Sequence, residues 1–440
     1  MARAADAEAG PRHLTSHRQL LATPGAVLPG TAQRQALPRW PIFALFAAFP
    51  VWWFLGAVPV LPPVLATIMA FYLLNSKRVI ILPGMAPWFL FIIWVAAAVV
   101  NVQGTGDLMG FGLRAMDIVL AGVSMLYVAN AGSSLPKERI VNYLVIVWIA
   151  IVGLGFLALM IPETRLNTVL GSVLPGSVTS NELVRNLVTP ALAEVQRPWG
   201  APEPFVRPAA PFPYANSWGA AFAMLVPVIV ARMAMMRHRA LSVLLGVILA
   251  LSFIPAVATS NRGMFVGLAI AVAYALFRHL GLGHWRMVAI LFSGVAVLAV
   301  ALVASGAVSG ILGRQEYSDS TGGRLALYAK TWEQSLQAPI LGHGTPRIDP
   351  TIGVSLGSQG FLWTLMFCYG FVGLALFLYF FAGGLLRTWR QSTVPDVWLH
   401  ASVLGGICLI PFYGLSVLQL AVLTTVLTVL LRQRYVGAHE

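Results

Sequence analysis

The stretch Thr259-Ser260-Asn261-Arg262-Gly263 joins two long apolar segments, residues 241–257 and 264–278. Arg262 is the one charged residue of this stretch, and it stands at the edge of an apolar segment. A charge near the hydrocarbon of a bilayer is costly, so it usually pairs, lines a polar cavity or marks a functional site. Its long stem can also reach the lipid headgroups. The setting of Arg262 therefore bears on both fold and function.

The composition is that of an integral membrane protein. Of 440 residues, 58% are hydrophobic and only 10% are charged, whereas soluble domains have about 25% charged residues. The apolar runs are about 16–25 residues long, which suits helices that cross roughly 30 Å of hydrocarbon. The sequence lacks the sustained polar–apolar alternation of a membrane β-barrel. We therefore predict an all-α membrane protein.

About twelve transmembrane helices are predicted from these apolar runs. The predicted spans are residues 40–58, 60–75, 86–101, 109–129, 140–161, 217–236, 241–257, 264–278, 287–309, 360–384, 397–414 and 418–431. Residues 1–38 have no apolar core of the kind found in signal peptides, and we expect them to form a disordered cytoplasmic tail. A single polytopic membrane domain, residues 39–440, follows.

The net charge of +13 does not indicate a nucleic-acid partner, because many basic residues lie in short clusters between apolar runs. With the N-terminus inside, 18 of the 28 Lys and Arg residues fall in inside segments: Arg3, Arg12, Arg18, Arg34, Arg39, Lys77, Arg78, Lys137, Arg139, Arg232, Arg237, Arg239, Arg278, Arg286, Arg387, Arg390, Arg432 and Arg434. This is the positive-inside pattern, and it places both termini in the cytoplasm. Eight others lie in two long outer loops, 162–216 and 310–359, which leaves Arg114 and Arg262.

Arginines of the outer face are the first candidates for chemistry. The two loops hold Arg165, Arg185, Arg197, Arg207, Arg314, Arg324 and Arg347. A guanidinium group pairs bidentately with phosphate and stays charged at physiological pH, so a convergence of arginines suits a diphosphate carried on a lipid. Arg114 and Asp117 share a helix face. They form either a structural ion pair or the wall of a polar cavity next to a site.

His343 is the one histidine of eight that this topology places outside, in Leu341-Gly342-His343-Gly344. An imidazole can take the proton of an acceptor hydroxyl, although a histidine in a loop can also be inert. Glu316, Asp319 and Asp349 are rival bases. The two cysteines, Cys368 and Cys408, lie within apolar segments, and no outer cluster has an obvious metal-ligand spacing, so we expect no metal or other cofactor.

Three motifs occur in a fixed order along residues 200–380. They are Arg207 with Ala215-Asn216 before a span, then Ser260-Asn261-Arg262-Gly263, then Gly323-Arg324, Trp332, Pro339-Ile340-Leu341-Gly342-His343-Gly344 and Gly370-Phe371-Val372-Gly373. They resemble the Arg…Pro-Asn element, the Ser-x-Ser-Arg-Gly element and the Arg…Trp…Pro-Leu-x-Gly-x-Gly…Gly-x-x-Gly block of the O-antigen ligase and polymerase superfamily of bacterial membrane glycosyltransferases.

This resemblance implies a fold of the GT-C type and metal-independent transfer of a glycan from an undecaprenyl diphosphate donor. It places Arg207 and Arg262 on the diphosphate and a histidine as the base. The usual His-Asn pair just before the span near Gly360 is replaced here by Ser358-Gln359. Either His343 substitutes for that histidine from earlier in the same loop, or the base is different. Further predicted substrate-binding residues are Arg324, Arg347, Arg197, Arg114 and Asn216.

The expected function is an inverting glycosyltransferase at the outer face of the bacterial inner membrane. Its partners would be membrane lipids, a polyprenyl diphosphate-linked glycan donor and an acceptor hydroxyl on a glycolipid, a glycan chain or a protein, in a ligase, polymerase or oligosaccharyltransferase reaction. Two other classes stay open: a transporter or flippase of lipid-linked glycan, and a non-catalytic scaffold of an envelope assembly complex. The concentration of polar residues on one face favours the enzyme.

Overall fold

Helices run between two ends of a unit that spans residues 36–440. The computed structural model describes residues 37–180, 182–197, 203–304 and 320–436. Most of the predicted tail, residues 1–36, lies outside the described residues. The helices of the described residues are α1 (Trp40–Leu45), α2 (Phe49–Phe54), η1 (Val58–Val60), α3 (Leu61–Leu74), α4 (Ala86–Ala97), η2 (Ala98–Asn101), α5 (Thr105–Asn130), η3 (Gly132–Ser134), α6 (Lys137–Met160), α7 (Val169–Val173), α8 (Gly176–Thr179), α9 (Glu182–Val188), α10 (Ala215–Met235), α11 (Arg239–Leu251), α12 (Phe253–Ala258), α13 (Arg262–Gly281), α14 (Trp285–Ala304), α16 (Ser320–Ser335), α17 (Phe361–Arg387), α18 (Val394–Ile407) and α19 (Val417–Val436).

The predicted class of helical membrane protein is confirmed. In the described ranges, seven helices are long and apolar enough to cross a membrane: Thr105–Asn130, Gly132–Met160, Ala215–Met235, Arg239–Ala258, Arg262–Gly281, Phe361–Arg387 and Val417–Val436. Shorter apolar helices cover Val58–Leu74, Ala86–Asn101 and Trp285–Val297. The predicted span 40–58 is broken into α1 and α2, with a proline near the start of each. The predicted span 397–414 falls on the 14-residue α18. The count of twelve stays a prediction.

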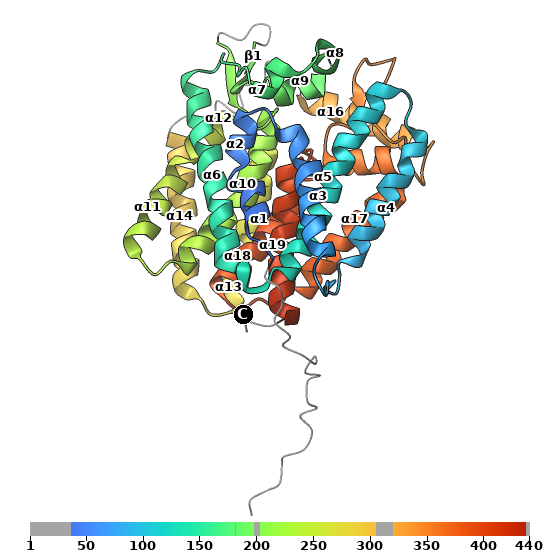
Figure 1. Cartoon of the computed structure of the whole chain (residues 1–440). Coiled ribbons are helices and arrows are strands. Elements are labelled where there is room, and N and C mark those ends of the chain that lie inside the picture. The colour runs from blue at the N-terminus through green and yellow to red at the C-terminus, as the bar shows by residue number, and fades with distance from the viewer. Residues whose placement is uncertain (1–36, 181, 198–202, 305–319, 437–440) are drawn as a thin grey trace, which may run out of the picture. The chain divides into compact units, whose positions relative to one another are not determined.

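Two small antiparallel sheets interrupt the helical pattern. Strand β1 (Ala193–Gln196) pairs with β2 (Phe205–Pro208), and β3 (Arg347–Ile348) pairs with β4 (Ser355–Leu356). Both hairpins lie in the predicted outer loops, and they join α7, α8, α9 and α16 at one end of the unit (Figure 1). The all-α prediction missed these hairpins because the strands are only two to four residues long.

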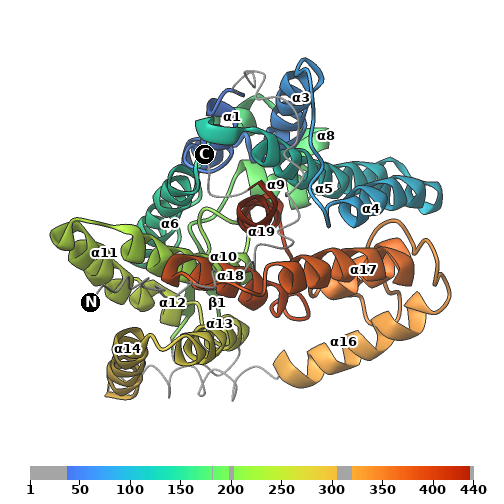
Figure 2. The ribbon, with the colours of Figure 1, turned by 90° about the horizontal axis from the view of Figure 1, so that it is seen from below.

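Helix α19 forms the centre of the helical unit, as the view along the helices shows (Figure 2). Its residues from Val417 through Arg432 are buried. Thr424 and Thr428 return their hydroxyls to carbonyls four residues earlier, at 2.9 and 2.7 Å, so these polar groups are satisfied within the helix. Because α19 is buried on every side, it has no face toward lipid. Its first turn therefore lies in the interior of the protein.

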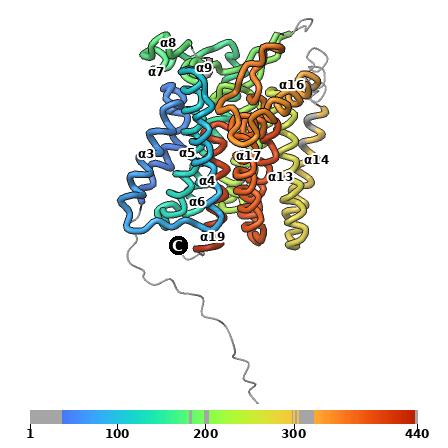
Figure 3. Tube along the Cα trace, turned by 90° about the vertical axis from the view of Figure 1, so that its right-hand side faces the viewer, coloured from blue at the N-terminus to red at the C-terminus, as the bar shows by residue number. Residues whose placement is uncertain are grey.

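The start of the described chain and the end of α19 lie at the end opposite to the hairpins (Figure 3). Ser134, in η3, donates its hydroxyl to Leu37 O at 2.8 Å. The next turn of the same connection, at Leu135, accepts a 2.7 Å bond from Arg432 of α19. This shared end agrees with an even number of crossings. That this end is cytoplasmic stays a prediction.

The Pro339–Gly344 motif has a structural explanation in a break of α17. Gly370 has φ +70° and ψ 179° in the middle of that helix. The break frees the carbonyls of Phe367 and Cys368, which accept bonds from His343 N and Gly344 N at 2.8 and 2.9 Å. Beyond the break, Phe371 N donates to Pro339 O at 2.8 Å. The two glycine motifs therefore meet as one backbone-to-backbone contact.

We expect Gly370→Ala to disrupt this contact. A Cβ at that position would stand 2.0 Å from Ile340 O, and the positive φ is itself unfavourable for alanine. The combined cost should be on the order of 3 kcal/mol, measured as a lowered unfolding temperature in detergent. The control is Gly153→Ala on α6, whose Cβ would meet nothing within 4 Å. Equal unfolding temperatures for the two variants would contradict this explanation.

Candidate functional site

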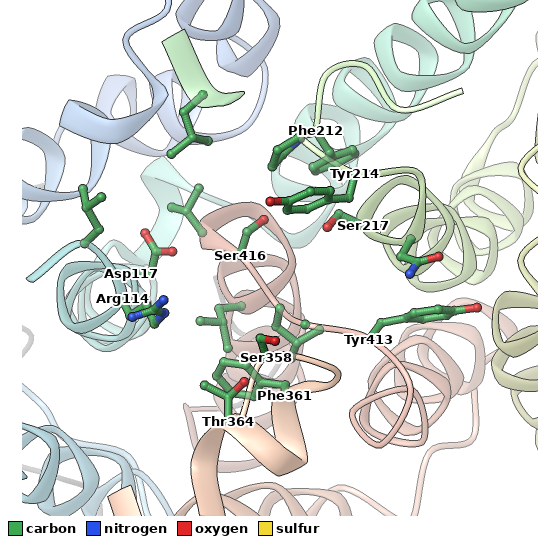
Figure 4. A pocket seen from close by; sticks show the side chains of 18 of the residues that line it. Arg114, Asp117, Phe212, Tyr214, Ser217, Ser358, Phe361, Thr364, Tyr413 and Ser416 are labelled. Carbon is green, nitrogen blue, oxygen red and sulfur yellow. The ribbon is translucent and has the colours of Figure 1, made fainter. Parts of the chain in front are cut away.

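A cavity of about 610 Å³ lies at the end of the unit that carries the hairpins. Its wall combines α2, α5, α9, β1, the first turns of α10, α17 and α19, and the loop between α18 and α19. Figure 4 labels ten of the lining residues. The polar residues of the whole lining are Arg114, Asp117, Asn186, Glu194, Tyr214, Asn216, Ser217, Ser355, Ser358, Gln359, Thr364, Tyr369, Tyr413 and Ser416. A concave, partly polar cavity of this size is suited to bind a small molecule or part of a larger one.

Arg114 is the cation that lines this cavity. It lies on α5, half-buried, with its guanidinium next to the Asp117 side chain in Figure 4. In the described part of the chain, Arg114 forms no hydrogen bond and no salt bridge within 4.0 Å. The Arg114–Asp117 pair forms no direct salt bridge within 4.0 Å, and both residues line the polar cavity. The guanidinium is available to an anion.

Asp117 meets the first turn of α19. Its carboxylate accepts a hydrogen bond from the backbone N–H of Val417, the first residue of that helix. Ser416 directs its backbone N–H to Gln419 Oε1 at 3.2 Å, and Gln419 Nε2 donates to Ser217 O of α10 at 2.9 Å. Because α5 rises about 1.5 Å per residue, Asp117 lies roughly 18 Å from Thr105 along the helix. The cavity therefore reaches well below the loops.

Arg207 is placed behind the wall of the cavity. Its side chain is 6% exposed. Nε donates to Thr259 O at 2.8 Å, Nη1 to Glu194 Oε2 at 2.8 Å, and Nη2 to Asn216 Oδ1 and Asn261 Oδ1 at 2.9 and 2.7 Å. A guanidinium has five N–H bonds, so four of them are used by these partners. Arg207 thereby joins the β1–β2 hairpin, the start of α10 and the α12–α13 connection.

The burial of Arg207 affects the pKa of its guanidinium. Loss of water lowers the pKa of the guanidinium, while the Glu194 carboxylate acts in the opposite direction. Glu194 spends its other oxygen on Ala215 N, at 2.9 Å. Both carboxylate oxygens are thus engaged, and the pair is a partly buried, hydrogen-bonded ion pair of the kind that fixes geometry.

The Ser260-Asn261-Arg262-Gly263 stretch forms the turn between α12 and α13. Ser260 has a left-handed φ of 53°. Asn261 donates Nδ2 to Ala215 O at 2.7 Å in addition to accepting from Arg207. Arg262 begins α13 and is exposed. A Cβ on Gly263 would stand 2.8 Å from the Tyr413 hydroxyl, so the glycine of this motif allows Tyr413 to approach.

Tyr413 connects the Arg262 turn to the cavity. Its hydroxyl accepts from Met264 N at 3.1 Å, and its ring lines the cavity. Burial raises the pKa of Tyr413, and nearby Arg324 and Arg207 lower it. Arg324, on α16, also hydrogen-bonds Tyr328. Arg324 and Arg262 therefore lie on the Tyr413 side of the site, outside the cavity lining.

The other predicted substrate-binding residues are distributed differently. Asn216 lines the cavity and binds Arg207. Arg347 donates to Asn101 O at 3.0 Å and to His343 O at 3.3 Å. Arg197 is 69% exposed and pairs with Glu163 at 2.7 Å. The structure brings Arg114 and Asn216 into the cavity wall and leaves Arg197 on the surface.

His343 packs away from the cavity lining. Its Nε2 lies 3.0 Å from Gln334 O, and its ring contacts Phe367 with centroids 4.6 Å apart. Because a carbonyl only accepts, this contact places the proton on Nε2. The rival Asp349 is bonded by the backbone and hydroxyl of Thr351, which lowers its pKa. Glu316 and Asp319 lie outside the described residues. The chemical role of His343 stays a prediction.

Sequence reasoning missed the loop that joins α18 to α19. Pro411 O accepts from Trp363 Nε1 at 3.0 Å and from Tyr328 at 3.4 Å. Tyr413 and Ser416, from the same loop, line the cavity, and so do Ser358 and Gln359. The one sequence signal for this loop is that it connects the outer ends of two predicted spans. The Ser358-Gln359 position, by contrast, was singled out by its departure from the family pattern.

These observations define a polytopic helical membrane protein with a polar cavity and a cluster of arginines at one end. Residues 247–378 match the family model described as O-antigen ligase, which supports membership of the O-antigen ligase and polymerase superfamily. The predicted resemblance is confirmed by this match, which covers the Arg262 turn and the motifs of α16 and α17. No match was found among curated proteins.

Proposed function

We propose that this protein is an inverting membrane glycosyltransferase of the GT-C type that transfers a glycan from an undecaprenyl diphosphate donor to a hydroxyl acceptor. The family match supports a ligase- or polymerase-like membrane glycosyltransferase. The observation that carries the finer proposal is the guanidinium of Arg114, which faces a cavity of about 610 Å³ and forms no hydrogen bond and no salt bridge within 4.0 Å in the described residues.

Arg114 and the first turn of α19 supply what a diphosphate needs. A guanidinium binds phosphate oxygens bidentately, and a helix N-terminus adds partial positive charge. As the bond between the sugar C1 and the diphosphate oxygen breaks, negative charge grows on that oxygen. Fixed positive groups stabilise this change, which is often the largest single term in catalysis. Arg262, beside the Tyr413 contact, is proposed as the second arginine on the donor, with Arg324 next to it.

Arg207 contributes by position. It holds Glu194 and Asn216 of the cavity wall and Asn261 of the Arg262 turn in one hydrogen-bonded unit. In this proposal Arg207 keeps its importance for the donor site, acting through the residues that it orients. The end that bears the cavity is proposed to face outward from the bacterial inner membrane, with twelve crossings and both termini cytoplasmic.

The test is transfer by the purified protein in detergent or nanodiscs. The assay contains a polyprenyl diphosphate-linked oligosaccharide and, separately, a glycolipid, a second copy of the glycan or a protein acceptor. We expect a new glycosidic product of inverted anomeric configuration and release of polyprenyl diphosphate in equal amounts. Movement of the donor across proteoliposomes without a covalent product would contradict the proposal and favour a flippase.

A further inference from the structure

We propose that Asp117 is the catalytic base that deprotonates the acceptor hydroxyl. This inference rests on the proposed function and goes beyond it by assigning the proton. A transfer to a hydroxyl needs a group that takes its proton, with a heavy-atom distance of about 2.6–3.2 Å in the reacting complex. The base must therefore be able to reach substrate within the cavity.

Two carboxylates line the cavity among the described residues, Asp117 and Glu194. Glu194 has one oxygen on Arg207 and the other on Ala215 N, so taking a proton would break a partly buried ion pair. Asp117 is bonded by one backbone N–H, that of Val417. In Figure 4 its carboxylate faces the space that Ser416 borders, one turn along α5 from Arg114. Asp117 is thus the carboxylate with accepting capacity to spare.

The position that holds histidine in the family pattern also points to Asp117. Ser358 lines the same cavity, and its hydroxyl donates to Ser355 O at 2.8 Å. A serine hydroxyl is a very weak base at neutral pH. His343 stands outside the lining, with its ring against Phe367. The cavity therefore has no base at this position, and in this proposal Asp117 supplies one from α5.

The proposed step balances as follows. The acceptor oxygen forms a bond to the sugar C1 and gives its proton to Asp117. The bond from C1 to the diphosphate oxygen breaks, and its electron pair stays with the diphosphate, where Arg114 stabilises the added charge. Protonated Asp117 returns its proton to water after the polyprenyl diphosphate leaves.

Asp117→Asn separates this role from a structural one. The asparagine oxygen still accepts the N–H of Val417, so a purely structural role would survive, but the amide cannot take a proton. We expect turnover to fall at least about 100-fold, with the unfolding temperature and donor affinity close to those of the wild type. Asp107→Asn, on the same helix and outside the cavity lining, is the matched control and should transfer normally.

Two further arms test the assignment of the proton. The acid limb of the rate–pH profile should be present in the wild type and move in Asp117→Glu. The charged and titratable groups that face Asp117 are Arg114 on α5 and Tyr369 on α17, so the limb is also measured in Tyr369→Phe. His343→Ala, assayed as folded protein, should keep turnover within about threefold of the wild type.

The outcomes are distinct. Asp117→Asn with at least a third of wild-type turnover overturns the assignment of Asp117 while the proposed function stands. Loss of transfer in His343→Ala at unchanged stability, with Asp117→Asn active, assigns the base to His343. A wild-type protein that transfers no glycan under any of the acceptor conditions removes the proposed function, and the assignment of Asp117 with it.

Discussion

Arg114→Ala is expected to lower transfer by about 100- to 1000-fold while the protein stays folded. The guanidinium lines the cavity and forms no hydrogen bond or salt bridge among the described residues, so its removal breaks no internal hydrogen bond. Loss of one fixed group that stabilises developing charge typically costs a factor of this size in turnover. Single-turnover transfer with purified protein, alongside the unfolding temperature, measures the two effects separately.

Arg114→Lys and Arg185→Ala complete this experiment. Lysine keeps the charge but binds as a point charge without the planar fork, so we expect an intermediate rate. Arg185 is exposed on α9 and does not line the cavity, and its removal should leave transfer unchanged. A fully active Arg114→Ala variant would mean that the donor diphosphate binds elsewhere.

Arg207→Met is expected to destabilise the protein by about 3 kcal/mol, because it leaves the partly buried Glu194 carboxylate without its cation. The carbonyl of Thr259 and the amide oxygens of Asn216 and Asn261 lose their donor as well. The loss appears as a lower unfolding temperature in detergent. The double variant Arg207→Met with Glu194→Gln should recover part of the stability, since the unpaired charge is gone and glutamine can still accept from Ala215 N.

The surface pair of Arg197 and Glu163 is the matched control for Arg207. Its two side chains are more than 60% exposed, and exposed pairs contribute about 0–1 kcal/mol. Arg197→Met should therefore change the unfolding temperature little. Should Arg207→Met fold as well as the wild type and lose donor affinity alone, Arg207 would be a direct diphosphate ligand, as the family resemblance implies.

Much of the fold followed from composition and periodicity. Apolar runs of helical length predicted a polytopic helical protein. The breaks inside the helices escaped detection, because a bent span and a straight one bury similar residues. Gly370 is an example. A glycine permits a kink in a helix, but only the packing of residues 339–344 against α17 requires one at this position.

The candidate site was predictable in part. The predicted outward-facing arginines pointed to the end of the molecule that carries the cavity, and to Arg114 as an anomaly within a span. Which arginine faces the cavity depended on partners far away in the chain. Glu194, Asn216 and Asn261 surround Arg207, whereas none of the described residues hydrogen-bonds to Arg114. Such pairings across 9 to 54 residues leave no local pattern.

The sequence by itself determined that this is a membrane protein and which superfamily it resembles, because hydropathy and short motifs are local properties. Only the tertiary structure decided the roles of its polar residues. Arg207 makes four hydrogen bonds to protein groups and so holds distant segments together. The buried helix α19 places its first turn against Asp117. The chemistry of an ionisable side chain depends on which partners and how much water surround it, and both are set by contacts between distant segments.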